Sequence, residues 1–363
     1  MKTTQPAPLP AAVSGVARVV DRRLEEMFES EQARWTEIDP DLISPLSALR
    51  ACTMSGGKRL RPAFCYWAFV GCGGTTDDPA VVDAGAALEM LHTAALVHDD
   101  VIDRSDRRHG SETVHVQQAA RHVAGGWKGG SQQFGTGVAI LLGDLALVYS
   151  DRLLAGSPDA AEAVFDEMRL EVNFGQYLDV LGSAQGVDVA GEVAVARARR
   201  ICRYKTAKYT VERPLHLGAA LAAPEKLAEV AGPLSRFGLP LGEAFQLRDD
   251  LLGVFGDPVT TGKPVGDDLR NGKPTLLASL AASRATGEGA RMMADRFGAS
   301  DLDASEVAVL QEVIETTGAR AEVERTVRSL LDAAVEALGT LPLSAPAVAA
   351  LREIADFVAG RDH

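Results

Sequence analysis

Two groups of aspartates stand inside apolar helical patterns, and they are the residues best suited to chemistry. Asp99, Asp100 and Asp103 lie in the segment HDDVID, and Asp249 and Asp250 lie far along the chain in QLRDDLLG. A helix brings residues i, i+3 and i+4 onto one side, so we expect the first three carboxylates to crowd one face. Carboxylates gathered in this way suit a divalent cation.

The segment before the first group strengthens this interpretation. Ala86–Val97 is almost wholly apolar, which predicts a buried helix that ends in acidic side chains. Such carboxylates repel one another and lose hydration, which is costly unless cations compensate. Mg²⁺ prefers oxygen ligands and is commonly shared between a few carboxylates and substrate phosphates. The pattern therefore predicts a magnesium site that binds a phosphorylated substrate.

Basic residues stand in or beside the breaks between the helical segments. The motif GGKRLRP places Lys58 and Arg61 three residues apart after a glycine turn, a geometry suited to a diphosphate. Taken singly, each basic residue has an ordinary explanation as a solvated flank or a surface ion pair. Taken with the aspartates, they predict a site with cationic walls. The other members of the set are Arg104, Arg107, Arg108, Lys205, Lys208, Lys263 and Lys273.

Apolar residues recur at helical spacing along most of the chain, so we expect an all-α fold. The clearest helical segments are Val16–Glu31, Val81–Val97, Ala160–Val180, Val193–Leu221 with a break at Pro214, Lys226–Val254 and Ala319–Leu338. Long loops, which are often functional, are predicted at Thr53–Pro62, Arg104–Gly137 and Gly256–Pro274. We expect a disordered tail at residues 1–12 and one large helical bundle around a central cavity at residues 13–363.

Composition narrows the class of protein. The 363 residues carry a formal net charge of −13 and show no basic stripe, which argues against nucleic acid as a partner. No uninterrupted apolar run reaches the roughly 18 residues needed to span a bilayer, so no membrane span is expected. The four cysteines have no metal-ligand spacing and suggest reduced thiols in a cytoplasm.

Five motifs in a fixed order make the chain similar to a known family. GGKRLRP, LHTAALVHDDVIDRSDRRHG, KTAKYT, FQLRDDLLGVFGD and GDDLRNGKPT together cover about residues 50–280. They resemble the trans-isoprenyl diphosphate synthases, or polyprenyl synthetases, and within them most closely bacterial geranylgeranyl diphosphate synthases. The resemblance implies an Mg²⁺-dependent prenyltransferase that condenses isopentenyl diphosphate with an allylic diphosphate. It also implies a homodimer.

The resemblance assigns metal-binding and catalytic roles by position. Asp99 and Asp103, supported by Asp100, would bind two Mg²⁺ ions that bridge the allylic diphosphate. Asp249, supported by Asp250, would bind a third ion from a facing helix. The catalytic residues would be Lys205, which clamps the allylic diphosphate, and Thr206 and Gln246, which line the allylic cation. Gln176 and Asp179 match a family position close to the metals.

It also assigns the residues that bind the two substrates. Lys58, Arg61 and His92 would hold the diphosphate of isopentenyl diphosphate, although a histidine on an apolar helix is more often a core residue. His92 lies two turns before Asp99 on the same helical face, which favours the role of ligand. The allylic diphosphate would be clamped by Arg108, Lys205 and Lys263, with assistance from Lys273, and Arg107 is counted with Arg108 among the substrate-binding residues.

The chain departs from the family pattern in two places. Relatives commonly have RRG after the first acidic motif, whereas this chain has Arg107-Arg108-His109-Gly110, so the role of His109 is open. A complete second motif would have aspartate at position 253, where this chain has Gly253. The nearby Asp257 is one candidate to replace the missing carboxylate.

Product length depends on the helix that carries Asp99, since the growing tail should run down beside it. One turn before Asp99 lie Ala94 and Ala95, which are too small to block the tail. Leu91, a turn further, is the first sizeable obstacle, and Tyr149 on another helix is a possible floor, though plain core packing explains it as well. We therefore expect a C20 product, with a longer product (C25 or more) or a farnesyl (C15) product as alternatives.

Three other classes share part of this pattern. A class I terpene cyclase also has an Asp-rich helix, but it usually carries an Asn/Asp…Ser…Glu second motif and does not need a second diphosphate site. A non-catalytic partner subunit would be expected to have lost its acidic motifs. A phosphohydrolase with an HD-type metal centre is suggested by His98-Asp99 alone, without further His/Asp ligands at suitable spacing.

Overall fold

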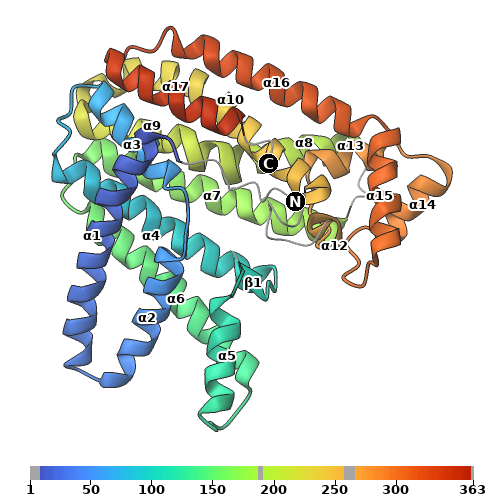
Figure 1. The fold of residues 1–363 in the computed structure, drawn as a ribbon, viewed down its shortest axis with the longest axis horizontal. Coiled ribbons are helices and arrows are strands. Elements are labelled where there is room, and N and C mark those ends of the chain that lie inside the picture. Colours follow the sequence, from blue (N-terminus) through green and yellow to red (C-terminus); the bar gives the residue numbers. More distant parts are fainter. Residues whose placement is uncertain (1–8, 109, 187–190, 257–265, 361–363) are drawn as a thin grey trace, which may run out of the picture.

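The structure is a computed structural model that describes residues 9–108, 110–186, 191–256 and 266–360. These residues fold almost entirely into helices, as the sequence predicts (Figure 1). The elements in chain order are α1 (Ala11–Thr36), η1 (Pro40–Leu42), α2 (Ile43–Met54), α3 (Leu60–Gly71), α4 (Pro79–Ile102), β1 (Arg107–Arg108), β2 (Ser111–Glu112), α5 (Val114–Ala124), α6 (Ser131–Leu154), α7 (Asp159–Gln185), α8 (Gly191–Ile201), η2 (Cys202–Glu212), α9 (Arg213–Ala222), η3 (Pro224–Lys226), α10 (Leu227–Phe255), α12 (Asp267–Arg270), α13 (Leu276–Arg284), α14 (Gly287–Arg296), α15 (Ala304–Thr316), α16 (Ala319–Leu338) and α17 (Ala345–Ala359).

Helix α4 is the central element of the first apolar cluster, or first core, which also includes buried residues of α1, α2, α3, α6 and α7. It begins at an N-cap, Asp78, whose side chain accepts a hydrogen bond from the amide of Ala80, and Pro79 occupies the first turn. Its residues from Ala84 to Met90 are buried, and it packs against α1, α2, α3, α6 and α9. By length and composition α4 is the one candidate membrane span among the described residues, but two-thirds of its apolar window is buried inside the fold. It is therefore a core helix.

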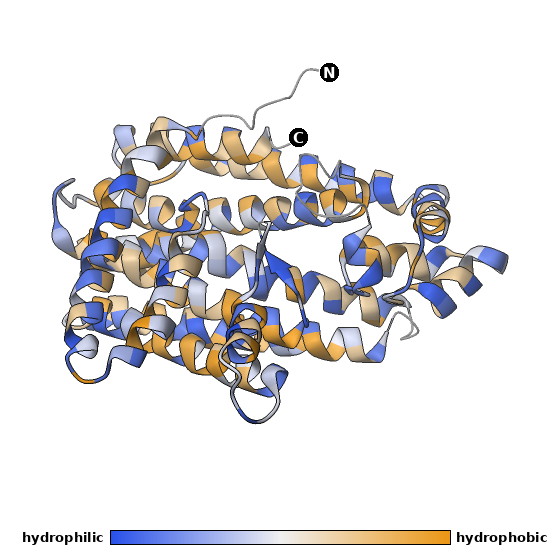
Figure 2. Ribbon diagram, turned by 60° about the horizontal axis from the view of Figure 1, so that its bottom comes forward, coloured by the Kyte–Doolittle hydropathy of each residue, from blue (hydrophilic) through white to orange (hydrophobic). Residues whose placement is uncertain are grey.

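The remaining helices extend this core into a bundle. A second apolar cluster joins α3, α9, α10, α16 and α17, and a third joins α8, α10, α13, α15 and α16. In Figure 1, α16 and α17 lie along the top and α5 projects at the bottom. Most helices carry hydrophobic and hydrophilic residues side by side, as expected when one face of a helix is buried (Figure 2).

The helical segment predicted at Val193–Leu221 is interrupted at a different position from the one expected. The chain leaves α-helical geometry at Cys202, follows a π-helix to Glu212 and then enters α9. Pro214 lies in the first turn of α9, so the chain departs from α-helical geometry before the proline. π-Helical turns are rare and occur mostly at functional sites.

Two other boundaries also differ from prediction. The segment Arg104–Gly137 is not a continuous loop, because it contains the short β1–β2 hairpin, the amphipathic helix α5 and the start of α6. Val114, Gln118 and His122 form the buried face of α5, a spacing that its many polar residues conceal. Helix α1 begins at Ala11, two residues inside the predicted tail, and the buried Ala12 belongs to the second core.

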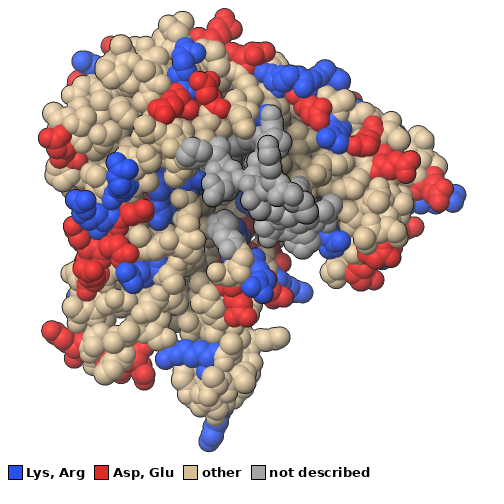
Figure 3. All heavy atoms as spheres, viewed as in Figure 1, with Lys and Arg blue, Asp and Glu red and all other residues tan. Residues whose placement is uncertain are grey.

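Charges are mixed over the molecular surface. On the face shown in Figure 3, Lys and Arg side chains alternate with Asp and Glu side chains over the described residues, without a continuous basic patch. The mixture of charges on this face agrees with the formal net charge of −13.

Candidate active site

The first group of aspartates occupies the last turn of α4 and the residue that follows it. Asp99 and Asp103 are partly exposed, with side-chain exposures of 18% and 27%, and they share one face of the helix. Asp100 turns inward and its side chain is 4% exposed. The expectation that all three carboxylates crowd one face is therefore wrong for Asp100, which projects about 100° away from Asp99 around the helix.

Three cations from distant parts of the sequence surround these carboxylates. Arg108 in β1 donates to Asp100 at 2.8 Å and lies 3.4 Å from Asp99. The ammonium of Lys205 in η2 lies 3.3 Å from Asp99. Lys273, after α12, places its Nζ atom 4.0 Å from Oδ2 of Asp103.

The pKa values show how far these cations balance the acidic group. Burial acts to raise the pKa of Asp99, but Lys205, Lys273 and Arg108 outweigh it, so this pKa is lowered. Burial raises the pKa of Asp100, and burial together with Asp99 raises that of Asp103. Carboxylates at the C-terminal end of a helix also face the negative end of its dipole. The cations therefore outweigh the cost of burial at Asp99 but not at Asp100 and Asp103.

One face of α7 supports the same group. Gln176 donates to Oδ1 of Asp99 at 2.9 Å, and Asp179 accepts from Lys205 at 2.5 Å. Burial acts to lower the pKa of Lys205, but Asp179 and Asp99 outweigh it, so this pKa is raised and the lysine stays charged. Gln176 and Asp179 thus fix the positions of the Asp99 carboxylate and the Lys205 ammonium.

The second group of aspartates lies two turns before the end of α10. Asp249 is exposed, whereas Asp250 is buried and accepts a hydrogen bond from Gln246 at 2.7 Å. Gln246 in turn accepts from the hydroxyl of Thr206 in η2 at 2.6 Å. Burial raises the pKa of Asp250 to about 8, so a cation beside it would displace a proton at neutral pH.

The carboxylate missing at position 253 has a neighbour that sequence reasoning did not single out. A Cβ atom on Gly253 would collide with the carboxylate of Asp268 in α12. Asp268 also acts to raise the pKa values of Asp250 and Lys273. The signal in the sequence was its place in the motif GDDLRNGKP, which also contains Lys273. Asp257 lies outside the described residues.

The donor set fits Mg²⁺ shared with a substrate rather than Mg²⁺ in a cage made only of protein. Asp99, Asp103 and Asp249 supply the hard oxygen atoms that this ion prefers. Among the described residues, no three His, Cys, Asp or Glu side chains converge on one point. Mg²⁺ is usually bound by one or two carboxylates together with phosphate oxygens, which agrees with this arrangement.

The charged side chains of the GGKRLRP motif contact residues of η2 and α17. Arg61 donates to the hydroxyl of Thr210 at 3.0 Å, and its guanidinium lies 4.4 Å from the centre of the Tyr209 ring. The ring of His92 on α4 lies 6.2 Å from the same tyrosine. Lys58 lies 5.3 Å from the ring of Phe357 in α17. Tyr209, a buried residue in the motif KTAKYT, thus joins Arg61 to His92.

Not every predicted site residue reaches the aspartates. Arg107 is exposed and donates to the backbone oxygen of Gly110 at 2.8 Å, while its neighbour Arg108 points to the acidic group. Arg107 and Arg108 point in different directions because successive side chains of a strand point to opposite sides. His109 and Lys263 lie outside the described residues.

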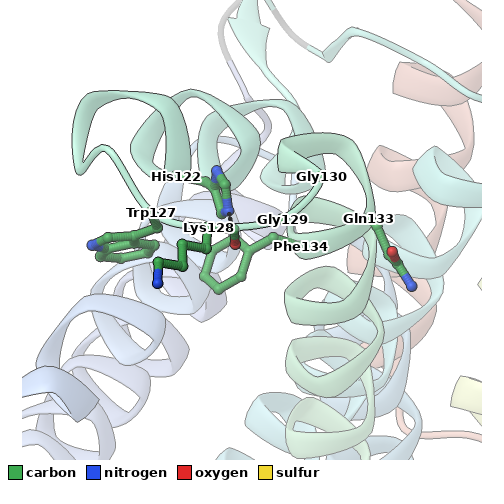
Figure 4. A pocket seen from close by; sticks show the side chains of 7 residues that line it. All are labelled: His122, Trp127, Lys128, Gly129, Gly130, Gln133 and Phe134. Carbon is green, nitrogen blue, oxygen red and sulfur yellow. Dashed lines mark hydrogen bonds between the residues drawn. The ribbon is translucent and has the colours of Figure 1, made fainter.

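A cavity lies where α5 connects to α6. It has a volume of 370 Å³ and is lined by seven residues, among them His122, Trp127 and Phe134 (Figure 4). The ring of His122 bonds to the backbone oxygen of Lys128 at 3.1 Å, and the three rings contact one another. None of the residues predicted to act in the site lines this cavity.

Two glycines hold the π-helix that carries Lys205 and Thr206. A Cβ atom on Gly175 of α7 would lie 2.6 Å from the backbone nitrogen of Lys205. A Cβ atom on Gly242 of α10 would lie 2.6 Å from Cα of Ala207. Both helices therefore touch the backbone of η2 directly, from two sides. Sequence reasoning did not identify either glycine, because each contact joins segments far apart in the chain.

Comparison with known proteins identifies the family. The polyprenyl synthetase family matches residues 46–316. A geranylfarnesyl diphosphate synthase from Aeropyrum pernix is 31% identical, over 89% of this chain and 96% of that protein. A geranylgeranyl diphosphate synthase from Mycobacterium tuberculosis is 36% identical, over 78% of this chain and 75% of that protein.

A solved structure gives the same result. Geranylgeranyl pyrophosphate synthase from Corynebacterium glutamicum, in complex with isoprenyl diphosphate and magnesium, superposes with a TM-score of 0.87. It is 36% identical, and the alignment covers 96% of this chain and 99% of that one. The family match and these relatives, together with the all-helical fold, define a prenyltransferase. The chain belongs to the polyprenyl synthetase family and is a trans-prenyl diphosphate synthase.

The two glycines make a first prediction. Gly175→Ala and Gly242→Ala should each lower kcat by about 10- to 100-fold, because the methyl group pushes Lys205 and Thr206 out of position. Gly232→Ala, also within α10, is the matched control, since its nearest contact is a flexible Arg236 atom at 3.8 Å. The rate of prenyl transfer, with circular dichroism to confirm folding, checks the prediction. Wild-type rates for both variants would show that the contacts do not position η2.

Proposed function

We propose that the protein joins isopentenyl diphosphate head-to-tail to an allylic diphosphate. The observation that supports this proposal is the presence of two groups of charged residues, which we assign to two diphosphates. One combines Asp99 and Asp103 with Lys205 and Lys273. The other contains Lys58, Arg61 and His92. Two separate sites suit a reaction between two diphosphates.

The first site is proposed to bind the allylic diphosphate and to promote cleavage of its C–O bond. Asp99, Asp103 and Asp249 would hold three Mg²⁺ ions, with Asp100 and Asp250 in support. When bound, the ions stabilise the negative charge of the departing diphosphate. Arg108, Lys205 and Lys273 add positive charge at the same place, and Lys263 is proposed to do so as well.

The second site is proposed to present the other substrate. Lys58, Arg61 and His92 hold the diphosphate of isopentenyl diphosphate, so that its double bond attacks the allylic cation. A new C–C bond forms, and the released diphosphate accepts the proton that is lost. Thr206 and Gln246 are proposed to lie beside the cation. A hydrogen bond between their side chains holds the two residues together. The apolar bundle excludes water, which would otherwise quench the cation.

The second diphosphate site also distinguishes this activity from that of a terpene cyclase. A cyclase converts one diphosphate and has no use for a second diphosphate site formed by Lys58, Arg61 and His92. The retained Asp99, Asp103 and Asp249 disfavour a non-catalytic partner subunit. We further propose a single domain and a cytoplasmic location, the latter from four free cysteines.

We propose a C20 product on the basis of the α4 face below Asp99. Ala95 is partly exposed although most of α4 is buried, which suits a small residue beside the tail. Leu91 is 2% exposed and packs in the first core. The hydroxyl of Tyr149 donates to the buried Glu31 at 3.0 Å, so this residue is held in place whether or not it contacts the tail.

We also propose a homodimer formed through α6 and α7. These helices expose large apolar side chains, an uncommon feature for a surface that stays in water. An ion pair links the two helices, since Arg169 of α7 pairs with Asp151 of α6 at 2.5 Å. The side chains are Ile140, Leu141, Val148, Leu170, Phe174, Tyr177 and Val180.

Incubation with Mg²⁺, isopentenyl diphosphate and each allylic primer in turn tests the proposed reaction. The expected result is a prenyl diphosphate longer than the primer, with no product after chelation of Mg²⁺. Asp103→Ala should lower kcat by at least about 100-fold, the usual scale for losing an electrostatic contact to a developing charge. Cyclic hydrocarbons formed without isopentenyl diphosphate would instead identify a cyclase.

Product length gives a separate prediction. Ala95→Phe should shorten the main product to C15, because the ring would fill the space one turn below Asp99. Chromatography of the dephosphorylated products measures the change. Ala94→Phe is the comparison, since Ala94 is 1% exposed and faces the core, so this change should destabilise the fold rather than select a length. An unchanged product from Ala95→Phe would refute this placement of the tail.

The dimer is tested by sedimentation. Phe174→Glu should shift the protein from dimer to monomer, because a charge would be buried in the apolar face. Val309→Glu, at an exposed valine on α15, is the control and should leave the mass unchanged. A dimer that persists in the Phe174→Glu variant would place the interface elsewhere.

A further inference from the structure

Arg59 stands between the two predicted diphosphate ligands, Lys58 and Arg61, yet it is 6% exposed. Its backbone is left-handed, with φ 50° and ψ 37°, directly before the first residue of α3. A long side chain rarely adopts this conformation, because Cβ approaches the next carbonyl oxygen. Gly56 and Gly57 also have positive φ angles, of 136° and 109°. The surrounding structure must hold this turn in place.

Three hydrogen bonds of the Arg59 side chain hold the turn in place. Nε donates to Asp21 of α1 at 2.8 Å, and Nη1 donates to Glu89 of α4 at 2.5 Å. Nη2 donates to the backbone oxygen of Thr53 near the end of α2 at 2.9 Å. Each nitrogen of the guanidinium thus bonds to a different element. Since the side chain is buried and all three nitrogens are engaged with protein, we expect Arg59 to act on a substrate through its neighbours.

The ion pair between Arg59 and Glu89 connects the turn to α4, the helix that carries His92. Glu89 is 3% exposed and lies one turn before His92, so both belong to one rigid stretch of helix. The Arg59–Glu89 pair therefore ties the turn that carries Lys58 and Arg61 to the helix that carries His92.

We infer that Arg59 is a positioning residue that fixes Lys58 and Arg61 relative to His92, and so sets the affinity for isopentenyl diphosphate. This inference rests on the proposed function, in which those three residues hold that diphosphate. The allylic site depends on other contacts, made by Asp99 with Lys205, Arg108 and Gln176. Disturbing Arg59 should therefore affect the two substrates unequally.

A purely structural role would give a different result. A buried ion pair is weak evidence of stability, because the cost of desolvation can exceed the attraction. If Arg59 served stability alone, its replacement would lower the melting temperature and leave the KM values of the folded enzyme unchanged. The ratio of the two KM values therefore separates the roles.

The experiment compares Arg59→Lys with a matched control. Lysine keeps the buried charge but cannot reach three partners at once, so KM for isopentenyl diphosphate should rise about tenfold while KM for the allylic primer stays within about twofold. Arg23→Met removes the half-exposed pair of Arg23 with Asp83, which joins α1 and α4 at 2.5 Å without touching the turn. It should change neither KM.

A second variant covers the case in which a lone substitution unfolds the protein. The double variant Arg59→Met/Glu89→Met removes both buried charges, which is often tolerated when apolar groups fill the space. It should fold and still show the raised KM for isopentenyl diphosphate. Unchanged KM values in both the Arg59→Lys and the double variant, or an equal rise for both substrates, would overturn the inference.

Parallel variants of the ligands separate this inference from the proposed function. Lys58→Ala and Arg61→Ala should each raise KM for isopentenyl diphosphate at least as much as Arg59→Lys. If neither does, the proposed binding site is wrong. If both do and Arg59→Lys does not, the site is correct and only the role of Arg59 is refuted.

Discussion

The organisation of this protein depends on carboxylates held near the C-terminal ends of two long helices. Asp99 and Asp103 end α4, and Asp249 and Asp250 lie two turns before the end of α10. Each helix directs the negative end of its dipole toward these groups, and burial makes their charge more costly. Cations from β1, η2 and the segment after α12 offset part of this cost. Substrate and metal are proposed to supply the rest.

This constraint explains why irregular structure collects around the site. The cations must come from segments far apart in sequence, so the chain forms a hairpin at β1–β2, a π-helix at η2 and a left-handed turn at Arg59. Ordinary helices hold each irregular segment. Asp100 of α4 binds Arg108 of the hairpin, Gly175 and Gly242 contact the backbone of η2, and Glu89 of α4 binds Arg59 of the turn. The regular core thus supports the unusual geometry that the chemistry requires.

The sequence predicted the all-helical fold because apolar residues repeat at helical spacing, most clearly in α16, which matches Ala319–Leu338 at both ends. It predicted which motifs bear charge, since aspartates in an apolar helix are conspicuous. It did not predict the inward turn of Asp100, the π-helix before Pro214, or Asp268 beside Gly253. These depend on contacts between distant segments, and a local pattern of residues carries no signal for them.

The most direct test of a metal site shared with substrate is to measure Mg²⁺ binding by calorimetry with and without inorganic pyrophosphate, after correction for binding between the two in buffer. The account predicts weak binding alone and at least about tenfold tighter binding with pyrophosphate, since each ligand must strengthen the other. Asp249→Asn should lose much of this gain. Equal Mg²⁺ affinity in the presence and absence of pyrophosphate would contradict a site that the protein and its substrate complete together.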